Sequence, residues 1–219
     1  MDLGGSQIMS RYWIVLPLMV FLLALPQPGR AQGTTYRGEA AAAEVRALFV
    51  NVAVSDTGPL PSSGGSLSAS LLDVTVPGLV GLHLLNADTT GVDSRTDSQA
   101  SVALATVTAA GIHITASILT SEASAACQIG HVELSGNSQI AALTVNGVSI
   151  TVTGEPNQTV PLLVGSLVIN EQIASSSTTP FFTSGDMLVN ALHLQVLGAV
   201  DVVISSSKAG VTCRSVVPL

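Results

Sequence analysis

The sequence predicts an all-β protein: an antiparallel β-sandwich-like domain of about ten strands, preceded by a signal-peptide helix. Three observations predict this fold. Apolar residues recur at every second position, turn-forming residues interrupt the alternating runs, and hydroxylated residues take the place of charged ones. A β-solenoid or a barrel is the alternative, although no internal repeat is convincing.

Charged residues are scarce. They make up 10% of the 219 residues, and hydrophobic residues make up 47%, whereas ordinary soluble domains carry about 25% charged residues. We therefore expect aliphatic side chains to face inward and serine and threonine to cover the surface. The net charge is −7 and the basic residues are scattered, so nucleic-acid binding is not expected.

The N-terminal segment has the pattern of a secretory signal peptide. An apolar run over residues 14–26 follows Arg11 and is shorter than the roughly 20 residues of a membrane-spanning helix. Gly29 and Ala31 are small residues that signal peptidase accepts, which predicts cleavage between Ala31 and Gln32. An uncleaved anchor is the alternative.

Cleavage at this point divides the chain into a signal peptide, residues 1–31, and one all-β domain, residues 32–219. The domain is expected to be secreted or extracytoplasmic, in the periplasm or at the cell surface. No late apolar span and no basic tail follow, so we expect no stable membrane span after cleavage.

Cys127 and Cys213 are the only cysteines, and both lie in the part predicted to be exported. An even number of cysteines outside the cytoplasm indicates a disulfide. A redox pair or a pair of metal ligands is the alternative, but the two cysteines are far apart in sequence and no histidine pair lies near them.

Alternation predicts the strands of the first half. In the first run, Val50, Val52 and Val54 share one face with Leu48, and a short helix over residues 39–44 competes with the start of this strand. A loop over residues 56–65 and a polar turn over residues 86–97 separate further strands. These strands are expected at residues 66–74, 79–85, 98–109 and 112–119, with another around Cys127.

The clearest local signal is a hairpin over residues 139–153. Asn146-Gly147 stands between two alternating runs, and this pair tolerates the positive φ angles of a type I′ turn. Further strands are expected at residues 159–173, 187–197, 199–205 and 210–217, with Gly198 dividing a long apolar run.

The histidines are the natural candidates for chemistry. His83, His113 and His193 each stand between two aliphatic residues and are expected to point outward. His131 and Glu133 share a face and could supply two metal ligands, but a zinc site needs three or four. Surface or structural histidines are the simpler interpretation.

An acidic stretch runs from Asp88 through Asp93 to Asp97 and is faintly similar to a calcium-binding loop. It lacks the ligand spacing of an EF-hand, so a solvated turn is favoured.

The sequence also has no nucleophile elbow, no His-Glu-x-x-His and no phosphate-binding glycine loop. We therefore predict a non-enzymatic protein, with no catalytic, cofactor-binding or metal-binding residue assigned.

The C-terminal half resembles the choice-of-anchor P family of bacterial secreted and surface proteins. The resemblance rests on residues 143–160, 167–173, 189–197 and 201–213, including the hairpin, Ala-Leu-His-Leu and Val-Thr-Cys, with a weaker match upstream. It implies a bacterial extracytoplasmic domain and brings no catalytic residues. The chain departs from the family in having no recognisable anchor.

Together these features favour a structural or adhesive β-domain of the bacterial envelope. Envelope polysaccharide or other surface proteins would be its partners. An extracytoplasmic metal- or ligand-binding module, using His131, Glu133 and a further histidine or the acidic stretch, is the alternative. A hydrolase of an unrecognised type is the third hypothesis, which converging polar groups in a pocket would support.

Overall fold

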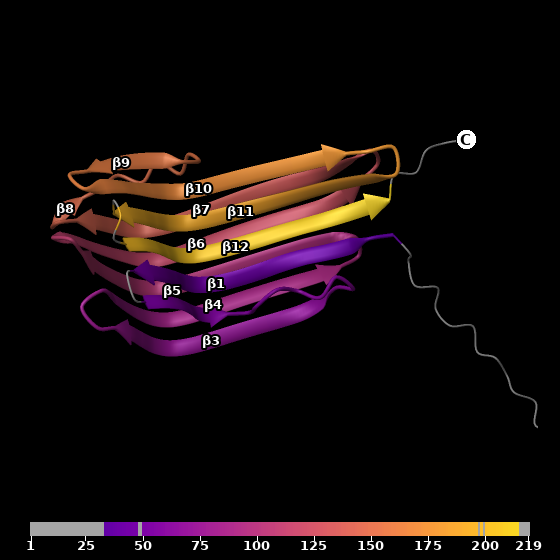
Figure 1. Ribbon diagram of the computed structural model, residues 1–219. Helices are drawn as coiled ribbons and strands as arrows, with labels where there is room; N and C mark the ends of the chain where they lie inside the picture. Colours follow the sequence, from indigo (N-terminus) through magenta and orange to yellow (C-terminus); the bar gives the residue numbers. More distant parts are fainter. Residues whose placement is uncertain (1–32, 48–49, 197, 199, 215–219) are drawn as a thin grey trace, which may run out of the picture. The chain divides into compact units, whose positions relative to one another are not determined.

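The computed structural model describes residues 33–47, 50–196, 198 and 200–214. The predicted signal peptide, with its cleavage point between Ala31 and Gln32, lies outside the described residues. The described part consists of twelve strands in two six-stranded antiparallel sheets (Figure 1). No helix long and apolar enough to cross a membrane occurs among the described residues.

The two sheets are formed by different parts of the chain. Sheet A has the order β2 (Val50–Asp56), β1 (Thr35–Ala47), β12 (Val200–Arg214), β11 (Phe182–Val196), β10 (Gly165–Thr178) and β9 (Gln158–Leu162). Sheet B has the order β3 (Gly65–Val76), β4 (Val80–Val92), β5 (Arg95–Ala109), β6 (Ile112–Gln128), β7 (His131–Val145) and β8 (Val148–Ser149). Sheet B is a simple meander of consecutive hairpins.

The sheets pack face to face, with β12 over β5 and β6, and β11 over β6 and β7. This arrangement confirms the predicted antiparallel sandwich over the alternative architectures. Sheet A combines the N-terminal and C-terminal strands and sheet B is the middle of the chain, and apolar side chains of both sheets are buried between them.

In each of the ten longer strands, the alternation of inward-facing and outward-facing side chains is interrupted once. These interruptions lie side by side and form a row across each sheet. In β5, Val102 and Ala105 are both buried, whereas the two residues between them face outward. The strand pairing is interrupted at the same point in neighbouring strands, for example between Ala103 and Ile118. We call this line across each sheet the bend row.

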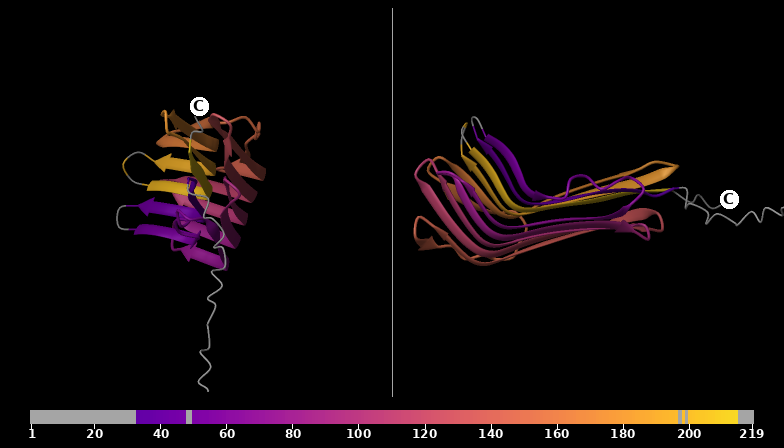
Figure 2. Two further views of the ribbon diagram at one scale, coloured as in Figure 1. Left: turned by 90° about the vertical axis from the view of Figure 1, so that its right-hand side faces the viewer. Right: turned by 90° about the horizontal axis from the view of Figure 1, so that it is seen from below.

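Backbone conformation explains the bend row. Alternate strands place a residue with positive φ there, and these residues are Ser55, Leu84, Ile118, Asn170 and Ser205. A left-handed residue turns the chain and reverses the side-chain alternation that follows it. Figure 2 shows the result: the strands of both layers turn in the same direction, with sheet A on the inner side of the bend.

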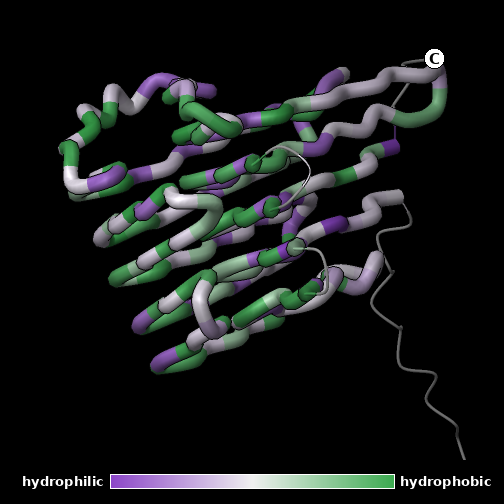
Figure 3. The backbone as a smooth tube through the Cα atoms, turned by 60° about the vertical axis from the view of Figure 1, so that its left-hand side comes forward, coloured by the Kyte–Doolittle hydropathy of each residue, from purple (hydrophilic) through white to green (hydrophobic). Residues whose placement is uncertain are grey.

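The interior differs between the two ends of the sandwich. Large aliphatic side chains, such as Leu82, Leu119 and Leu194, fill the end that contains the bend. Figure 3 shows hydrophobic residues concentrated there and paler, more polar residues along the rest of the strands. A smaller apolar cluster around Val189 and Val211 closes the far end.

Between these clusters lies a seam of buried hydroxyl groups that join the two sheets. Ser205 of β12 donates to the Ala100 carbonyl of β5 at 2.9 Å, and Ser207 donates to the Ser121 carbonyl of β6 at 3.0 Å. Ser98 donates to the Lys208 carbonyl at 2.6 Å. Serine and threonine were expected to cover the surface, and the sequence did not indicate that some of them join the two sheets in the interior.

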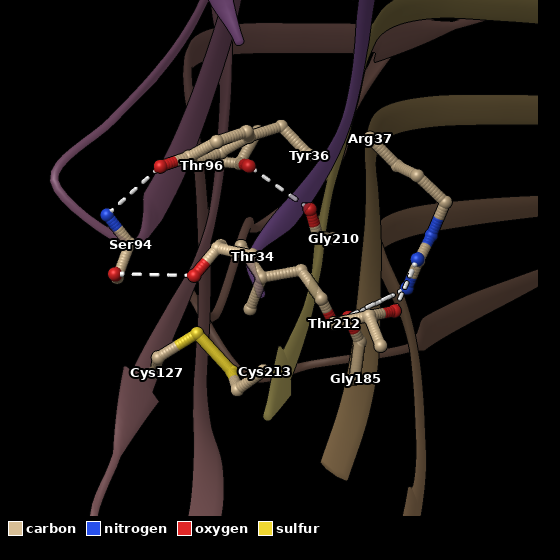
Figure 4. The surroundings of a disulfide bond; sticks show 11 residues. Thr34, Tyr36, Arg37, Ser94, Thr96, Cys127, Gly185, Gly210, Thr212 and Cys213 are labelled. Carbon is tan, nitrogen blue, oxygen red and sulfur yellow. Dashed lines mark hydrogen bonds between the residues drawn. A yellow bond between two sulfur atoms is a disulfide. The ribbon is translucent and has the colours of Figure 1, made fainter. Parts of the chain in front are cut away.

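The disulfide lies at the end of the sandwich remote from the bend. It joins Cys127 of β6 to Cys213 of β12, with an S–S distance of 2.01 Å. Figure 4 shows the hydrogen bonds beside it, in which Thr96 donates to the Gly210 carbonyl and the Ser94 amide donates to the Tyr36 hydroxyl. Covalent and hydrogen bonds thus tie sheet A to sheet B at this end.

The predicted hairpin at Asn146-Gly147 is present. Both residues have positive φ, of 51° and 79°, and Val145 pairs with Val148 across the turn. The returning strand is shorter than expected, because β8 contains only two residues.

The polar turn expected over residues 86–97 is wrong. Strand β4 continues to Val92 and β5 starts at Arg95, so Asp93-Ser94 alone forms the turn, with φ of 49° and 64°. Two residues with positive φ make a type I′ turn that matches the strand twist. Of the polar residues on either side, Asn86 and Asp88 face outward, whereas Thr89 and Thr96 are buried between the layers.

The expected division of the N-terminal run is also wrong. Residues 39–44 are strand rather than helix, because the small side chains of Ala40, Ala42 and Ala43 are buried between the layers and this burial overrides helix propensity. Ala47 pairs with Val50, so the run belongs to two strands and not one. Residues 48–49, which include Leu48, lie outside the described residues.

Other strands also start or end at residues different from those predicted. Residues 199–205 and 210–217 were expected as separate strands, but β12 runs through from Val200 to Arg214, and β6 likewise continues to Gln128. In contrast, residues 159–173 are divided between β9 and β10. The apparent breaks in alternation inside β6 and β12 are the bend row, not turns.

Candidate functional site

The inner side of the bend forms a crease on the outer face of sheet A. At the bend row of sheet A, two consecutive residues of a strand face inward, so the residues that flank them both face outward, and the bend brings these together. The flanking residues of β11 and β12 are only 3% to 9% exposed although they lie on the outer face. They are Asn190, His193, Val203 and Ser206.

A hydrogen-bonded cluster lies in the crease. The Glu171 Oε2 atom accepts a bond from Asn190 Nδ2 at 2.6 Å and lies 2.8 Å from His193 Nδ1. The other ring nitrogen, His193 Nε2, lies 3.2 Å from Asp201 Oδ1. His193 therefore joins β10 to β12 across β11.

One atom of this cluster has no partner. Asn190 is 4% exposed, and its side-chain carbonyl oxygen accepts no hydrogen bond. Leaving a buried acceptor unpaired costs about 1–3 kcal/mol. A group with a donor, placed in the crease by a small rearrangement, would satisfy this oxygen.

The crease is a shallow hollow with charged walls. Its volume is about 240 Å³, and Glu44 and Arg46 of β1 form an ion pair of 2.8 Å at its margin. Lys208 of β12 pairs with Glu39 at 3.2 Å on the other side. Three carboxylates, of Glu44, Glu171 and Asp201, and two cations, of Arg46 and Lys208, line the hollow.

A second hollow of about 420 Å³ continues from the crease along the same face. Ile173, Leu188 and Lys208 line both hollows, so the two form one groove on the outer face of sheet A. Arg37 and Asp186 stand in its far part, joined at 2.7 Å. The groove has aliphatic residues, among them Ile173 and Leu188, with charged and polar groups at intervals.

The four histidines do not converge. His83, His113 and His131 lie on sheet B, and only His193 lies on sheet A. His83 bonds to Asp73, and His113 lies 3.1 Å from the Thr108 hydroxyl. No set of three or more histidine, cysteine or acidic residues placed to hold a metal occurs in the described ranges.

The acidic stretch is spread over a β-hairpin. Asp88 and Asp97 lie in adjacent strands, Asp93 is in the turn, and Arg95 bonds to Asp97 at 2.7 Å. This hydrogen bond, with the negative charge of Asp97, raises the pKa of Arg95 above its ordinary value. Glu133 accepts a bond from Gln128 at 3.1 Å, and the structure does not assemble it with His131 into a metal site.

Sequence reasoning singled out His193 but missed Glu171, Asn190 and Asp201. The available signal was the pair of adjacent residues Ala191-Leu192, which breaks strict alternation and places Asn190 and His193 on one face. Nothing in the sequence indicates which strands supply the carboxylates. Glu171 and Asp201 lie near His193 because β10 and β12 are the neighbours of β11 in the folded sheet.

No family model matches the sequence, and no curated protein matches it. The resemblance to the choice-of-anchor P family stays a prediction.

Proposed function

We propose that this protein is a non-enzymatic, extracytoplasmic β-domain of a bacterial envelope, with a structural or adhesive role. The groove on the outer face of sheet A is its contact site, and envelope polysaccharide is its ligand. The observation that carries this proposal is the crease itself, where a curved sheet face gathers hydrogen-bonding groups around a buried, unpaired oxygen.

The disulfide supports an extracytoplasmic location. Cys127 and Cys213 are bonded to each other, and such bonds persist in oxidising compartments. The resemblance to a bacterial secreted family and the predicted signal peptide point the same way.

The chemistry of the groove favours a polysaccharide. Sugar hydroxyls both donate and accept, which matches a surface where Glu171, Asn190 and Asp201 supply acceptors and Arg46 and Lys208 supply donors. No aromatic residue lines the groove among the described residues. Recognition would therefore depend on hydrogen bonds and aliphatic contacts rather than on stacking against a sugar ring.

The crease groups support binding over catalysis. Glu171 and His193, the strongest acid–base candidates, are bonded to each other and to Asn190 and Asp201. In this arrangement they hold three strands together and shape the crease.

Binding to purified bacterial envelope polysaccharides, measured by isothermal calorimetry, tests the proposal. Glu171→Ala removes the acceptor that orders Asn190 and His193, and we expect it to weaken binding at least about tenfold, as for loss of hydrogen bonds to a charged group.

Glu122→Ala is the matched control, since Glu122 is an exposed carboxylate of β6 on the other sheet. It should leave the affinity unchanged. The proposal fails if the native protein binds none of these polysaccharides, or if both variants weaken binding equally. Circular dichroism of each variant separates loss of binding from loss of fold.

A further inference from the structure

The two sides of the sandwich end very differently. On one side, sheet B ends in β8 with two residues and sheet A ends in β9 with five, one of which is Pro161. Short strands and proline hinder pairing at an edge, but β8 covers only Thr144 and Val145 of β7, and β9 covers only residues 165–169 of β10. On the other side, sheet B ends in β3, which has twelve residues, and no described strand lies beyond it.

Strand β3 carries few of the features that protect an exposed edge. Among residues 65–76 the only charged residue is Asp73, which bonds to His83 of its own sheet. Neither lysine nor proline occurs in the strand. Leu71 is 47% exposed and Leu72 is 71% exposed. A long edge strand with these properties presents unpaired backbone donors and acceptors to a partner strand.

The bend row restricts which partner strand fits. Leu71 pairs with the buried Leu85 and Val74 pairs with the buried Leu82, so both face the inside of the sandwich. Leu72 and Asp73, between them, face outward together. A matching strand must present two consecutive outward residues at the same point, or an inward residue will stand opposite an outward one.

We infer that β3 pairs antiparallel with β3 of a second copy of this chain, about a two-fold axis between Leu72 and Asp73. In this register Leu72 stands opposite Asp73 of the other copy, and Leu71 stands opposite Val74. The inward residues Ala69 and Val76 also stand opposite each other. Other antiparallel registers that include the bend rows of both copies in the paired segment place an inward residue opposite an outward one.

The pairing is self-complementary in its side chains as well. Leu71 and Val74 of both copies meet on the inner face, where they extend the aliphatic core of the sandwich across the axis. Sheet B becomes one continuous sheet through the two copies. Because the contact is two-fold symmetric and uses β3 of each copy once, pairing through β3 stops at two copies.

Analytical ultracentrifugation of the exported protein at micromolar concentrations tests the association. We expect a dimer, and we expect Leu72→Asp to raise its dissociation constant at least tenfold, because the new carboxylate stands beside Asp73 of the other copy. Leu163→Asp is the control. Leu163 is fully exposed in the turn between β9 and β10, on the side of the sandwich opposite to β3. It should leave the dimer intact. A monomeric native protein overturns the inference, as does equal weakening by both variants.

Cross-linking tests the register. Ser70 and Thr75 are exposed, outward-facing and opposite each other in the pairing. A mixture of the Ser70→Cys and Thr75→Cys proteins should form a disulfide between copies under mild oxidation, and neither variant alone should do so. Cross-linking of either variant with itself in preference to the mixture, or assemblies larger than two copies, would contradict the two-fold arrangement.

Discussion

Ser205 of β12 donates its hydroxyl proton to the backbone carbonyl of Ala100 in β5, on the facing sheet, at 2.9 Å. The same hydroxyl group lies 3.0 Å from the Ser121 hydroxyl. Both sheets thus use each other's backbone as hydrogen-bond partners in the interior. A sandwich whose layers are joined in this way depends on individual hydroxyl groups as well as on apolar burial.

Ser205→Ala should therefore destabilise the protein. It removes a buried hydrogen bond between the two sheets, and such a bond contributes about 0.5–1.5 kcal/mol of net stability. Urea unfolding followed by circular dichroism measures the change. Ser68→Ala is the control, because Ser68 is exposed in β3, and a surface substitution changes stability by less than about 0.5 kcal/mol. Equal stability of the two variants would show that the seam contributes nothing.

Removing the disulfide should have a larger effect. Cys127 and Cys213 are 86 residues apart, and closing a loop of this size lowers the entropy of the unfolded chain by the equivalent of about 4–5 kcal/mol. We expect the Cys127→Ala/Cys213→Ala variant to unfold at a clearly lower temperature than the native protein. An unchanged melting temperature in the variant, or a native protein in which both thiols react with a labelling reagent, contradicts the bond.

Leu82 and Leu84 provide a direct test of the bend row. Strict alternation places both on one face, but Leu82 is 1% exposed and Leu84 is 55% exposed. Leu82→Ala should cost about 2–5 kcal/mol, as for a large buried aliphatic residue. Leu84→Ala should cost much less, because it opens no internal cavity. Comparable losses in chemical denaturation would mean that the strand does not shift its facing there.

The predicted export also has a direct test. Signal peptidase should cleave between Ala31 and Gln32, so the protein recovered from outside the cytoplasm should begin at Gln32. N-terminal sequencing or intact mass spectrometry measures this. Retention of Trp13, the only tryptophan of the chain, would indicate an uncleaved anchor instead.

Much of the fold could be predicted from local sequence. Alternation and turn residues are enough to predict a sandwich, and Asn146-Gly147 is enough to predict its hairpin. These signals depend only on residues that are close together in the sequence. The turn at Asp93-Ser94 was missed because its flanking residues are polar on the outward face, so a strand and a loop look alike there. The buried serines were missed because their partners are carbonyls of a distant strand.

The crease could not be predicted for a related reason. His193 stands out in the sequence, but Glu171 and Asp201 reach it through strands that pair only in the folded sheet. The shift of alternation at Ala191-Leu192 is visible in the sequence. Its meaning depends on the same shift occurring at the same row in β10 and β12, which one strand alone does not reveal.

The shared row constrains how the length of this chain can change in evolution. From Ala103 to the end of β5, and from the start of β6 to Ile118, the two strands contain equal numbers of residues, which keeps their turning points aligned. An insertion in one strand alone would displace its turning point from those of its neighbours. Tolerated insertions should therefore fall in the hairpin tips, or occur as matched pairs in adjoining strands.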